Sequence, residues 1–376
     1  MKLKKISIEK LGLIFLCCLI LLFSFCSETK QTGSLPRAKT PETENVSSAG
    51  LIKYLDALKE SGMEFHSIMI VRHGKVVSEG WWKPAKADSL HVMHSVSKSF
   101  TSSAIGFAVT ENLLAVKDKV ISFFQDELPD SISPYLEELT VKDLLTMSVG
   151  HENELPIRNV PADTTWVKAF LCWPITHPPG TFYMYNTPAT YMLSAIVQKV
   201  TGQKLLDYLT PRLFQPLSIE GALWEESPQG INMGGFGLYI KTEDMAKFGQ
   251  LYLQKGRWNG IQVLPESWID EATSLQINQG PAWAKGISKE ESDWNNGYGY
   301  QFWRSRHNSY RADGAYGQYI IIIPEKDAVI INTANVNDMQ KELNLIWDFV
   351  LPALSDDKLP VDIESAKELK KRLSDL

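Results

Sequence analysis

The chain has 376 residues, of which 44% are apolar and 22% are charged, with 24 Gly and 19 Pro. These proportions are those of a globular protein and exclude collagen-like, coiled-coil and wholly disordered chains. The length allows one large domain or two smaller ones with a sizeable core. The net charge of −6 argues against nucleic acid as a partner, because phosphate binding requires a basic face.

Residues 1–26 show the pattern of an export signal. Four lysines within residues 1–10 precede the apolar run 11–25, which is shorter than the roughly 20 residues that span a bilayer. The run ends at Cys26 and a polar segment follows, which resembles a bacterial lipoprotein signal, although Phe25 stands where a small residue is usual. We expect an exported protein, periplasmic or at the cell surface, held at the membrane by lipid on Cys26. A signal cut elsewhere and an uncleaved anchor are the alternatives.

The remaining chain divides into a tether and a folded domain. Residues 27–48 are rich in Ser, Thr, Pro and Glu and hold almost no large apolar residues, which predicts a flexible tether. Residues 49–376 are expected to form the domain. Without the signal, Cys172 is the one cysteine besides Cys26, so no disulfide is expected and stability depends on the core.

The first elements of the domain are a helix and a hairpin. Apolar residues at helical spacing predict a helix over 49–58, and Gly62 supplies a stop. Two apolar runs, 67–72 and 75–82, flank His73-Gly74 and predict two strands joined by a tight turn.

A second strand pair lies near the other end of the chain. Runs 319–324 and 328–332 predict these strands, and a helix is expected over 340–351. The middle, from about residue 95 to 230, is mostly helical in pattern, and parallel βαβ alternation is absent. The predicted fold class is therefore α+β: an antiparallel sheet built from both chain ends and flanked by helices, with an inserted helical subdomain.

Ser95 and Lys98 form the pattern Ser-x-x-Lys at the start of a run whose Val96 and Phe100 suit a helix packed into a core. Residues three apart share a helix face, so the Lys98 amine would lie beside the Ser95 hydroxyl. A serine hydroxyl becomes nucleophilic when a base takes its proton, and a desolvated lysine can be that base. The same spacing occurs twice within residues 1–32, where catalysis is not expected, so the pattern alone is a weak signal.

The context of Ser95 resembles the penicillin-recognising serine hydrolases, in particular the class C β-lactamase-like branch, which includes esterases, D-amino-acid peptidases and 6-aminohexanoate-dimer hydrolases. The resemblance covers most of residues 50–352 and depends on six segments in the family's order. They are HSVSKSFTS around Ser95, VKDLLTMSVGH at 141–151, PPGTFYMYNTPATYMLSAIVQKVTG at 178–202, GGFGLYIKTEDMAKFGQLYLQKG at 234–256, YGYQFWR at 298–304 and ADGAYGQYIIIIP at 312–324.

The resemblance implies that Ser95 is the nucleophile and Lys98 its base. The second motif of the family is usually Tyr-x-Asn or Ser-x-Asn, and here Tyr185 supplies the phenol while Thr187 stands where Asn is commonest. A phenol beside an ammonium can share its proton, so Tyr185 is expected to relay protons to the leaving group. Tyr183 is the rival for this role, and Tyr185 is preferred because it matches the family's spacing.

The third motif, normally Lys-Thr-Gly or His-Ser-Gly on an edge strand, corresponds to Ala312-Asp313-Gly314, so its cation is missing. Gly314 would let substrate lie against the strand. The resemblance implies an oxyanion hole made by the backbone N–H groups of Ala315 and Ser95. In β-lactam and peptidoglycan enzymes the missing cation helps to hold a substrate carboxylate. The neighbouring Arg311 is expected to face away, because adjacent strand residues point to opposite sides.

Other residues are expected to contact substrate, and no cofactor or metal is required. No Gly-x-Ser-x-Gly of an α/β-hydrolase occurs, and His91 and His94 lack the carboxylates of a zinc site, so ordinary packing is expected for both. Trp303 and Trp166 are candidates for the pocket wall, with a core position as the default, and His177 borders the same region. The expected substrate-binding residues are Thr187, Gly314, Tyr316, Trp294 and His151.

These observations predict an exported serine hydrolase that forms an acyl-enzyme at Ser95 and cleaves an ester or amide of a small, uncharged acyl substrate. A β-lactamase or D-amino-acid peptidase acting on cell-wall-type substrates is the first alternative. A non-catalytic binding or sensor module on the same fold is the second, because fold alone does not set function. The predicted partners are a small-molecule substrate and a membrane, and the sequence does not indicate an oligomeric state.

Overall fold

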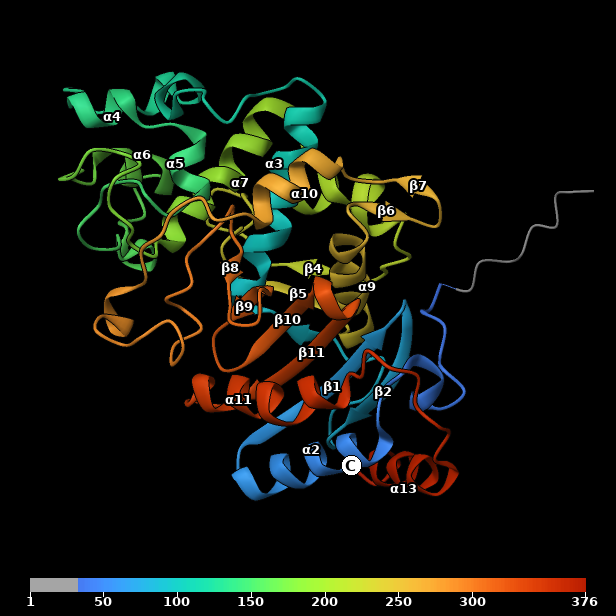
Figure 1. Ribbon diagram of the computed structural model, residues 1–376. Helices are drawn as coiled ribbons and strands as arrows, with labels where there is room; N and C mark the ends of the chain where they lie inside the picture. The colour runs from blue at the N-terminus through green and yellow to red at the C-terminus, as the bar shows by residue number, and fades with distance from the viewer. Residues whose placement is uncertain (1–32) are drawn as a thin grey trace, which may run out of the picture. The chain divides into compact units, whose positions relative to one another are not determined.

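A six-stranded antiparallel sheet forms the centre of the folded body (Figure 1). The computed structural model describes residues 33–376, so the predicted signal with Cys26 and residues 27–32 of the predicted tether lie outside the described residues. The strand order is β2-β1-β11-β10-β9-β8, which confirms that strands from both chain ends meet in one sheet. The strands are β1 (Glu64–Arg72), β2 (Lys75–Trp81), β8 (Trp303–Arg304), β9 (Tyr310–Gly314), β10 (Gln318–Ile323) and β11 (Ala328–Asn335).

The two predicted strand pairs are both present as hairpins, and they lie side by side in the sheet. β1 and β2 are connected at His73-Gly74, where both residues have a positive φ, as a two-residue hairpin turn requires. β10 pairs with β11 from Tyr319 opposite Asn332 to Ile323 opposite Ala328. β11 also pairs with β1, which joins the two hairpins. Both faces of these central strands are covered, so the runs 319–323 of β10 and 328–331 of β11 are continuously apolar rather than alternating.

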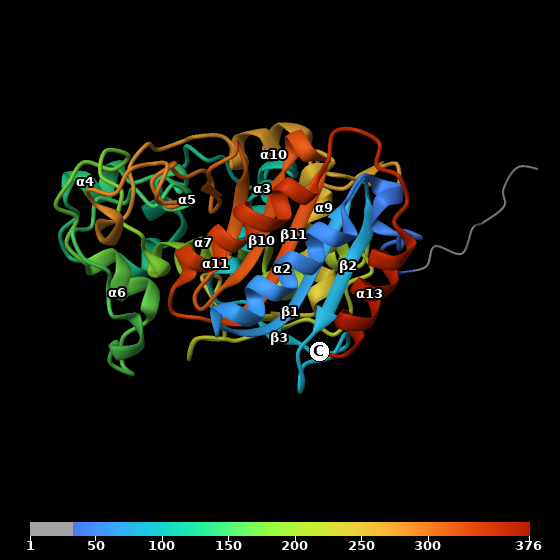
Figure 2. The same cartoon turned by 60° about the horizontal axis from the view of Figure 1, so that its bottom comes forward.

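Helices from the two ends of the chain cover one face of the sheet (Figure 2). α2 (Ser48–Ser61) begins after the Ser47 cap, whose hydroxyl accepts the Gly50 N–H, and ends at Gly62 in the left-handed region, as predicted. The helix expected over 340–351 is present, but its middle turn is a π-helix. The C-terminal helix of this layer was not predicted. The elements are α11 (Met339–Leu345), η9 (Ile346–Val350), α12 (Leu351–Ala353) and α13 (Ile363–Ser374).

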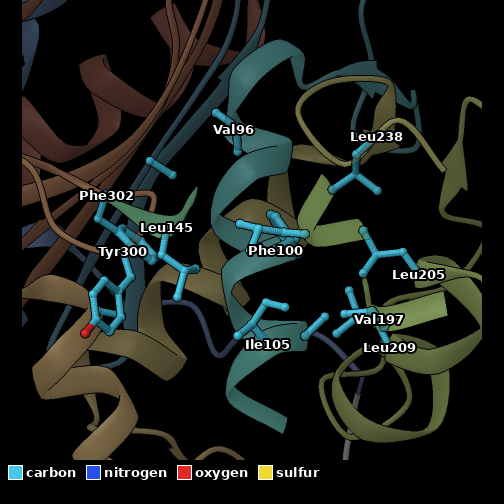
Figure 3. Close-up of a cluster of buried hydrophobic side chains, with 14 of the residues drawn as sticks. Val96, Phe100, Ile105, Leu145, Val197, Leu205, Leu209, Leu238, Tyr300 and Phe302 are labelled. Carbon is cyan, nitrogen blue, oxygen red and sulfur yellow. The ribbon is translucent and has the colours of Figure 1, made fainter. Parts of the chain in front are cut away.

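α9 (Thr242–Leu253) packs against the opposite face of the sheet, beside the helical region. Gly249 permits this close approach, because a Cβ at this position would lie 2.5 Å from the Val329 side chain. A large hydrophobic core joins this face of the sheet to the helical region. α3 (Ser97–Thr110) runs through the centre of this core, and apolar side chains from other segments lie on both sides of it (Figure 3). Figure 3 labels Val96, Phe100 and Ile105, then Val197, Leu205, Leu209 and Leu238 on one side and Leu145, Tyr300 and Phe302 on the other.

The helical region predicted over about residues 95–230 is present, and its short helices surround α3 and a second long helix. α7 (Thr187–Thr201) starts at an Asn186 cap and ends at Gly202 in the left-handed region. The other helices of 33–376 are η1 (Pro41–Glu44), η2 (His94–Val96), η3 (Val120–Phe123), η4 (Gln125–Glu127), α4 (Pro134–Glu138), α5 (Val141–Leu145), η5 (Ile157–Asn159), α6 (Trp166–Cys172), α8 (Leu205–Leu209), η6 (Thr210–Phe214), α10 (Glu266–Thr273), η7 (Ala282–Ala284) and η8 (Pro324–Lys326). The small sheets contain β3 (His91–Val92), β4 (Leu223–Trp224), β5 (Leu238–Ile240), β6 (Arg257–Trp258) and β7 (Ile261–Gln262).

Residues 35–48, assigned above to a flexible tether, are instead packed on the folded body. Leu35 and Val46 are buried, and Arg37 forms a parallel bridge with Val76 of β2. The Arg37 guanidinium also pairs with Glu79 at 2.8 Å and with Glu243 at 2.7 Å. The polar composition misled the prediction because these residues bind through ion pairs and backbone hydrogen bonds rather than through large apolar side chains. Within residues 33–376, no helix combines the length and the apolar character that crossing a membrane requires.

Candidate active site

A cleft of about 450 Å³ opens beside β9, where the sheet meets the helical region. One wall is the segment 278–296, called here the cleft loop. The other walls come from η2, from the residue Tyr185 before α7, from β8 and β9, and from residues 337–340 at the start of α11. The predicted residues Ser95, Tyr185, Ala315, Trp294 and Trp303 all line this cleft. The full lining is Ser95, Tyr185, Trp283, Ala284, Ile287, Glu291, Ser292, Trp294, Trp303, Asp313, Ala315, Asn337, Asp338, Met339 and Gln340.

Ser95 lies on the short 3-10 turn η2, directly before α3. His94 before it has a φ of 44°, a left-handed value that few residues other than glycine adopt, so the chain bends sharply at the serine. Ser97 fixes this bend, because its hydroxyl donates to the His94 carbonyl at 2.6 Å and accepts the Leu238 N–H at 3.2 Å. The turn therefore presents the Ser95 side chain to the cleft while the next residues enter the buried helix.

The Lys98 amine lies next to the Ser95 hydroxyl, at the spacing that the sequence predicted. Its Nζ donates to Ser95 Oγ at 3.0 Å and to the Gly235 carbonyl at 2.7 Å, and the Thr187 hydroxyl is 3.4 Å away. Lys98 is 1% exposed. Burial lowers the pKa of Lys98 to about 7, against the opposing charges of Glu154 and Asp313. A large fraction of the amine is therefore neutral near pH 7 and able to accept a proton.

Two features that hold Lys98 were not identified from the sequence. Gly235 must lack a side chain, because a Cβ would lie 2.7 Å from the Thr187 methyl and 3.4 Å from the Lys98 Nζ. Glu154, in the loop before α6, accepts the Thr187 N–H at 2.7 Å at the start of α7. The carboxylate thus satisfies a free helix N–H and places a negative charge near the Lys98 amine. An exposed glutamate in a loop carries no pattern that distinguishes it from others.

The Tyr185 ring lies over Lys98 and is stacked on Trp303. The Lys98 Nζ is 5.0 Å from the centre of the Tyr185 ring, and the Trp303 ring is 5.6 Å away at 19°. Burial raises the pKa of Tyr185 well above its ordinary value, and a hydrogen bond with the Ser95 hydroxyl partly opposes this. Tyr185 is therefore a neutral phenol that can donate a proton. The rival Tyr183 is absent from the cleft lining; it is buried against Tyr298, and among the described residues its hydroxyl has no partner.

Two backbone N–H groups at the mouth of the cleft, those of Ser95 and Ala315, are free to bind an oxyanion. Within residues 33–376 neither group donates a hydrogen bond. Gly314 brings them together, since a Cβ here would lie 2.5 Å from the Met93 carbonyl oxygen and 3.3 Å from the Ser95 nitrogen. The glycine thus lets β9 pack against the serine turn, whereas the sequence suggested that it makes room for substrate.

The position of the missing cation is apolar, and the neighbouring Arg311 does not replace it. Ala312 is part of the core. Arg311 lies on the same face of β9 as the cleft residue Asp313, to which it is ion-paired at 2.8 Å. Its guanidinium is 4.9 Å from the ring centre of Trp294, and it is fully buried behind this indole. Arg311 thus points to the opposite side of β9 from Ala312, as expected, and it is enclosed by its own partners and absent from the cleft lining.

Three other expected contacts lie elsewhere. His151 is fully buried against Phe170, with its Nδ1 bonded to the Asn186 amide at 3.0 Å, which contradicts the expectation that it touches substrate. Burial lowers the pKa of His151 to about 4. Tyr316 points toward His94, with ring centres 5.4 Å apart, and is not in the cleft lining. The third, Thr187, reaches Lys98 rather than the cleft, as described above.

The remaining aromatic and histidine candidates are also placed. Trp166 packs on Tyr191 in the helical core, and His177 stacks on Phe182. His91 bonds to His66 through their ring nitrogens at 2.7 Å. In the described part of the chain, no three His, Cys, Asp or Glu side chains converge as metal ligands.

A nucleophilic serine, a neutral amine in contact with it, a phenol donor and two free N–H groups are the parts that acyl transfer needs. The fold and the site thus define a serine hydrolase of the Ser-x-x-Lys type. The family model described as Beta-lactamase matches residues 54–354, and the chain belongs to this family.

Individual relatives are distant. An uncharacterized protein of Alkalihalophilus pseudofirmus is 22% identical over 238 residues, 56% of this chain and 65% of that protein, which is just under two thirds of its length. A β-lactamase of Escherichia coli is 21% identical over 308 residues, with 68% of this chain and 78% of that protein covered. The 6-aminohexanoate-dimer hydrolase of Paenarthrobacter ureafaciens is 23% identical over 334 residues, with 81% and 83% covered.

Solved structures support the same fold. The structure of a putative 6-aminohexanoate-dimer hydrolase from Bacillus anthracis matches with a TM-score of 0.65 at 22% identity, and covers 82% of this chain and 83% of that one. At this identity the likeness speaks for the fold alone.

Proposed function

We propose that this protein hydrolyses ester or amide bonds of small, uncharged, apolar acyl substrates through an acyl-enzyme on Ser95. The observation that carries the proposal is the Lys98 Nζ at 3.0 Å from the Oγ of Ser95, which lines the cleft, together with the lowering of the Lys98 pKa to about 7. Geometry and pKa together are what a general base requires.

In acylation, the neutral Lys98 amine takes the Ser95 proton as Oγ attacks the substrate carbonyl carbon. The developing oxyanion is bound by the N–H groups of Ser95 and Ala315, each of which is worth roughly 3 to 4 kcal/mol in such sites. Because its pKa is raised, Tyr185 holds its proton and can donate it to the leaving alcohol or amine, and the Lys98 ammonium can then return a proton to the phenol. In deacylation, water takes the place of the leaving group: the Lys98–Tyr185 pair accepts a proton from water as the water oxygen attacks the acyl carbon. Ser95 Oγ then leaves and regains its proton, and the acid is released.

The character of the cleft supports an uncharged, apolar acyl group. Trp283, Trp294 and Trp303 supply indole surface. The charged side chains of the lining are Glu291, Asp313 and Asp338, all carboxylates, and Arg311 is enclosed behind Trp294. A substrate carboxylate would meet repulsion here without a cation to hold it.

A fluorophosphonate label tests the chemistry without assuming a substrate. We expect covalent attachment to Ser95 in the wild-type protein and none in Ser95→Ala. Absence of label on the folded wild type would instead favour a binding or sensor module on the same fold.

A substrate panel then tests the class of substrate. We expect turnover of p-nitrophenyl esters with short acyl chains and little or no turnover of a chromogenic cephalosporin. The β-lactamase among the relatives makes β-lactam or D-amino-acid peptide cleavage the second candidate. Rapid cephalosporin hydrolysis would establish that candidate and overturn the argument from Ala312 and Arg311.

We further propose export, with lipid on Cys26, from the basic and apolar pattern of residues 1–26. Mass spectrometry of the mature N-terminus tests this. A lipid-modified Cys26 at the N-terminus is expected, and an unmodified chain cut at another residue would overturn it.

A further inference from the structure

The oxyanion N–H of Ala315 belongs to a three-residue turn, Ala315–Tyr316–Gly317, that joins β9 to β10. Ala315 and Tyr316 are exposed, and Tyr316 and Gly317 have positive φ values of 65° and 87°. Catalysis requires this N–H to point at the transition state to within a fraction of an ångström. A surface turn of this kind needs fixed partners to supply such precision.

Gln318, the residue after the turn, provides these partners from inside the protein. Its Nε2 donates to the Ala315 carbonyl at 3.0 Å and to the Ala334 carbonyl at 2.8 Å, and its Oε1 accepts the Ala334 N–H at 3.2 Å. The side chain is 1% exposed. The backbone ladder between β10 and β11 ends at Tyr319–Asn332, so the Gln318 amide continues it by one step and ties the turn to β11.

The other side of the turn is held as well. The Val336 N–H donates to the Tyr316 carbonyl at 3.0 Å. Below it, the buried Glu342 of α11 lies against Gly317, where a Cβ would meet its Oε2 at 2.0 Å. Burial raises the pKa of the Glu342 carboxyl well above its ordinary value. Burial thus favours the neutral form of this carboxyl, which would place no negative charge against the turn.

We propose that Gln318 is a positioning residue of the oxyanion hole: its side-chain amide holds the Ala315–Tyr316 peptide, and through the Ala315 Cα it steadies the preceding Gly314–Ala315 peptide, whose N–H binds the transition state. Gln318 does not touch substrate, because it is absent from the cleft lining and acts through the Ala315 carbonyl. Loss of the amide donor frees the Ala315–Tyr316 peptide to rotate, and the adjoining Gly314–Ala315 peptide then loses part of what fixes the direction of its N–H. The inference rests on the proposed acyl-enzyme function.

The test compares Gln318→Met and Gln318→Glu with Gln301→Met in the full-length chain. Methionine keeps the length of the side chain without its hydrogen bonds, and glutamate keeps its shape and its acceptor without the donor to Ala315. Gln301 is a matched control, because it is 2% exposed and also makes three hydrogen bonds, to Leu144, Leu145 and Thr190.

For both Gln318 variants we expect kcat/KM on a p-nitrophenyl ester to fall by about 10- to 100-fold, with KM changed by less than about two-fold. Binding of benzeneboronic acid, which mimics the tetrahedral intermediate, should weaken by the same factor as kcat/KM. Gln301→Met should lose comparable thermal stability but retain boronate affinity, because it lies away from the turn.

Three results would overturn the inference. They are Gln318 variants with kcat/KM within about two-fold of wild type, a Gln301→Met variant that loses boronate affinity equally, and failure of both Gln318 variants to fold, which would make the residue structural. An inactive, unlabelled wild type would overturn the proposed function itself, and this result is separate from the other three.

Discussion

The nucleophile side of the cleft and the cleft loop opposite it differ in how their side chains are held. Lys98 is buried and bonded to residues from three segments, and Ser95 is set by the turn that Ser97 fixes. In the cleft loop, Trp283 is 62% exposed and Ile287 is 47% exposed, and the loop is held by its own asparagines, such as Asn295, which donates to two loop carbonyls. We therefore expect the proposed reaction to depend on rigid elements and the choice of substrate to depend on the cleft loop.

The strongest test of the rigid side is removal of the base. We expect Lys98→Met to lower kcat by at least about 1000-fold, because Ser95 then has no proton acceptor. The substitution also tests the buried amine through stability. The native pKa of about 7 lies below the ordinary 10.5, so the unfolded state binds more protons between these values and wild-type stability should rise with pH there.

Thermal unfolding from pH 6 to 10 measures this dependence of stability on pH. The increase in stability with pH should be present in the wild type and absent in Lys98→Met. Full activity in this variant would remove Lys98 from the mechanism.

Removal of the phenol should have the next largest effect. Tyr185→Phe keeps the ring stacked on Trp303 but deletes the proton donor, and we expect kcat to fall by about 100-fold. The loss should be smaller for p-nitrophenyl esters than for anilides, because a poor leaving group depends more on protonation. Tyr183→Phe is the control, since its hydroxyl is buried outside the cleft lining. Equal losses in the two variants would contradict the assignment of the relay to Tyr185.

The loop side predicts a change in selectivity rather than in chemistry. Trp283→Ala should lower kcat/KM for p-nitrophenyl octanoate by about 5- to 20-fold, the equivalent of about 1 to 2 kcal/mol of lost apolar contact, and change the acetate by less than about two-fold. Because Trp283 is exposed, unfolding stability should change by less than about 0.5 kcal/mol. Leu223→Ala, at an exposed apolar residue on β4 outside the lining, should change neither rate. Equal losses of kcat/KM for the octanoate and the acetate would show that Trp283 acts on the reaction itself rather than on the choice of acyl chain.

The smallest expected effect is a shift of the pH profile. Below the Lys98 pKa of about 7 the amine is protonated and cannot act as a base. In this range kcat/KM should decrease as the pH is lowered, by up to about tenfold per pH unit. The Glu154 charge raises this pKa, so Glu154→Gln should move the rising limb to lower pH without changing the plateau. Glu152→Gln, two residues away and also exposed, is the control. An unmoved limb would show that the Glu154 carboxylate does not act on Lys98.

What the sequence predicted depends on how local the signal is. The Ser95–Lys98 contact follows from three residues of separation on one turn of chain, and both hairpins follow from their own turns. The partners that complete the site are distant in sequence: Gly235 accepts a hydrogen bond from Lys98, and residues 337–340 at the start of α11 form one wall of the cleft. Periodicity does not show such contacts, because side-chain identity alone does not indicate which remote segment lies opposite. His151 was misplaced for the same reason, since nothing nearby in sequence shows that Phe170 and Asn186 enclose it.

The C-terminal helix α13 has a further consequence for the sheet. β2 is the outermost strand, and exposed strands of this length offer unpaired N–H and C=O groups to other chains. Here α13 packs beside β2, with Gly80 pressed against Leu373, and the Arg37 bridge occupies part of the remaining border. At the opposite border, β8 is only two residues long. Neither edge of the sheet therefore leaves a long row of unpaired backbone groups to which a strand of another molecule could add. This arrangement disfavours self-association through the sheet.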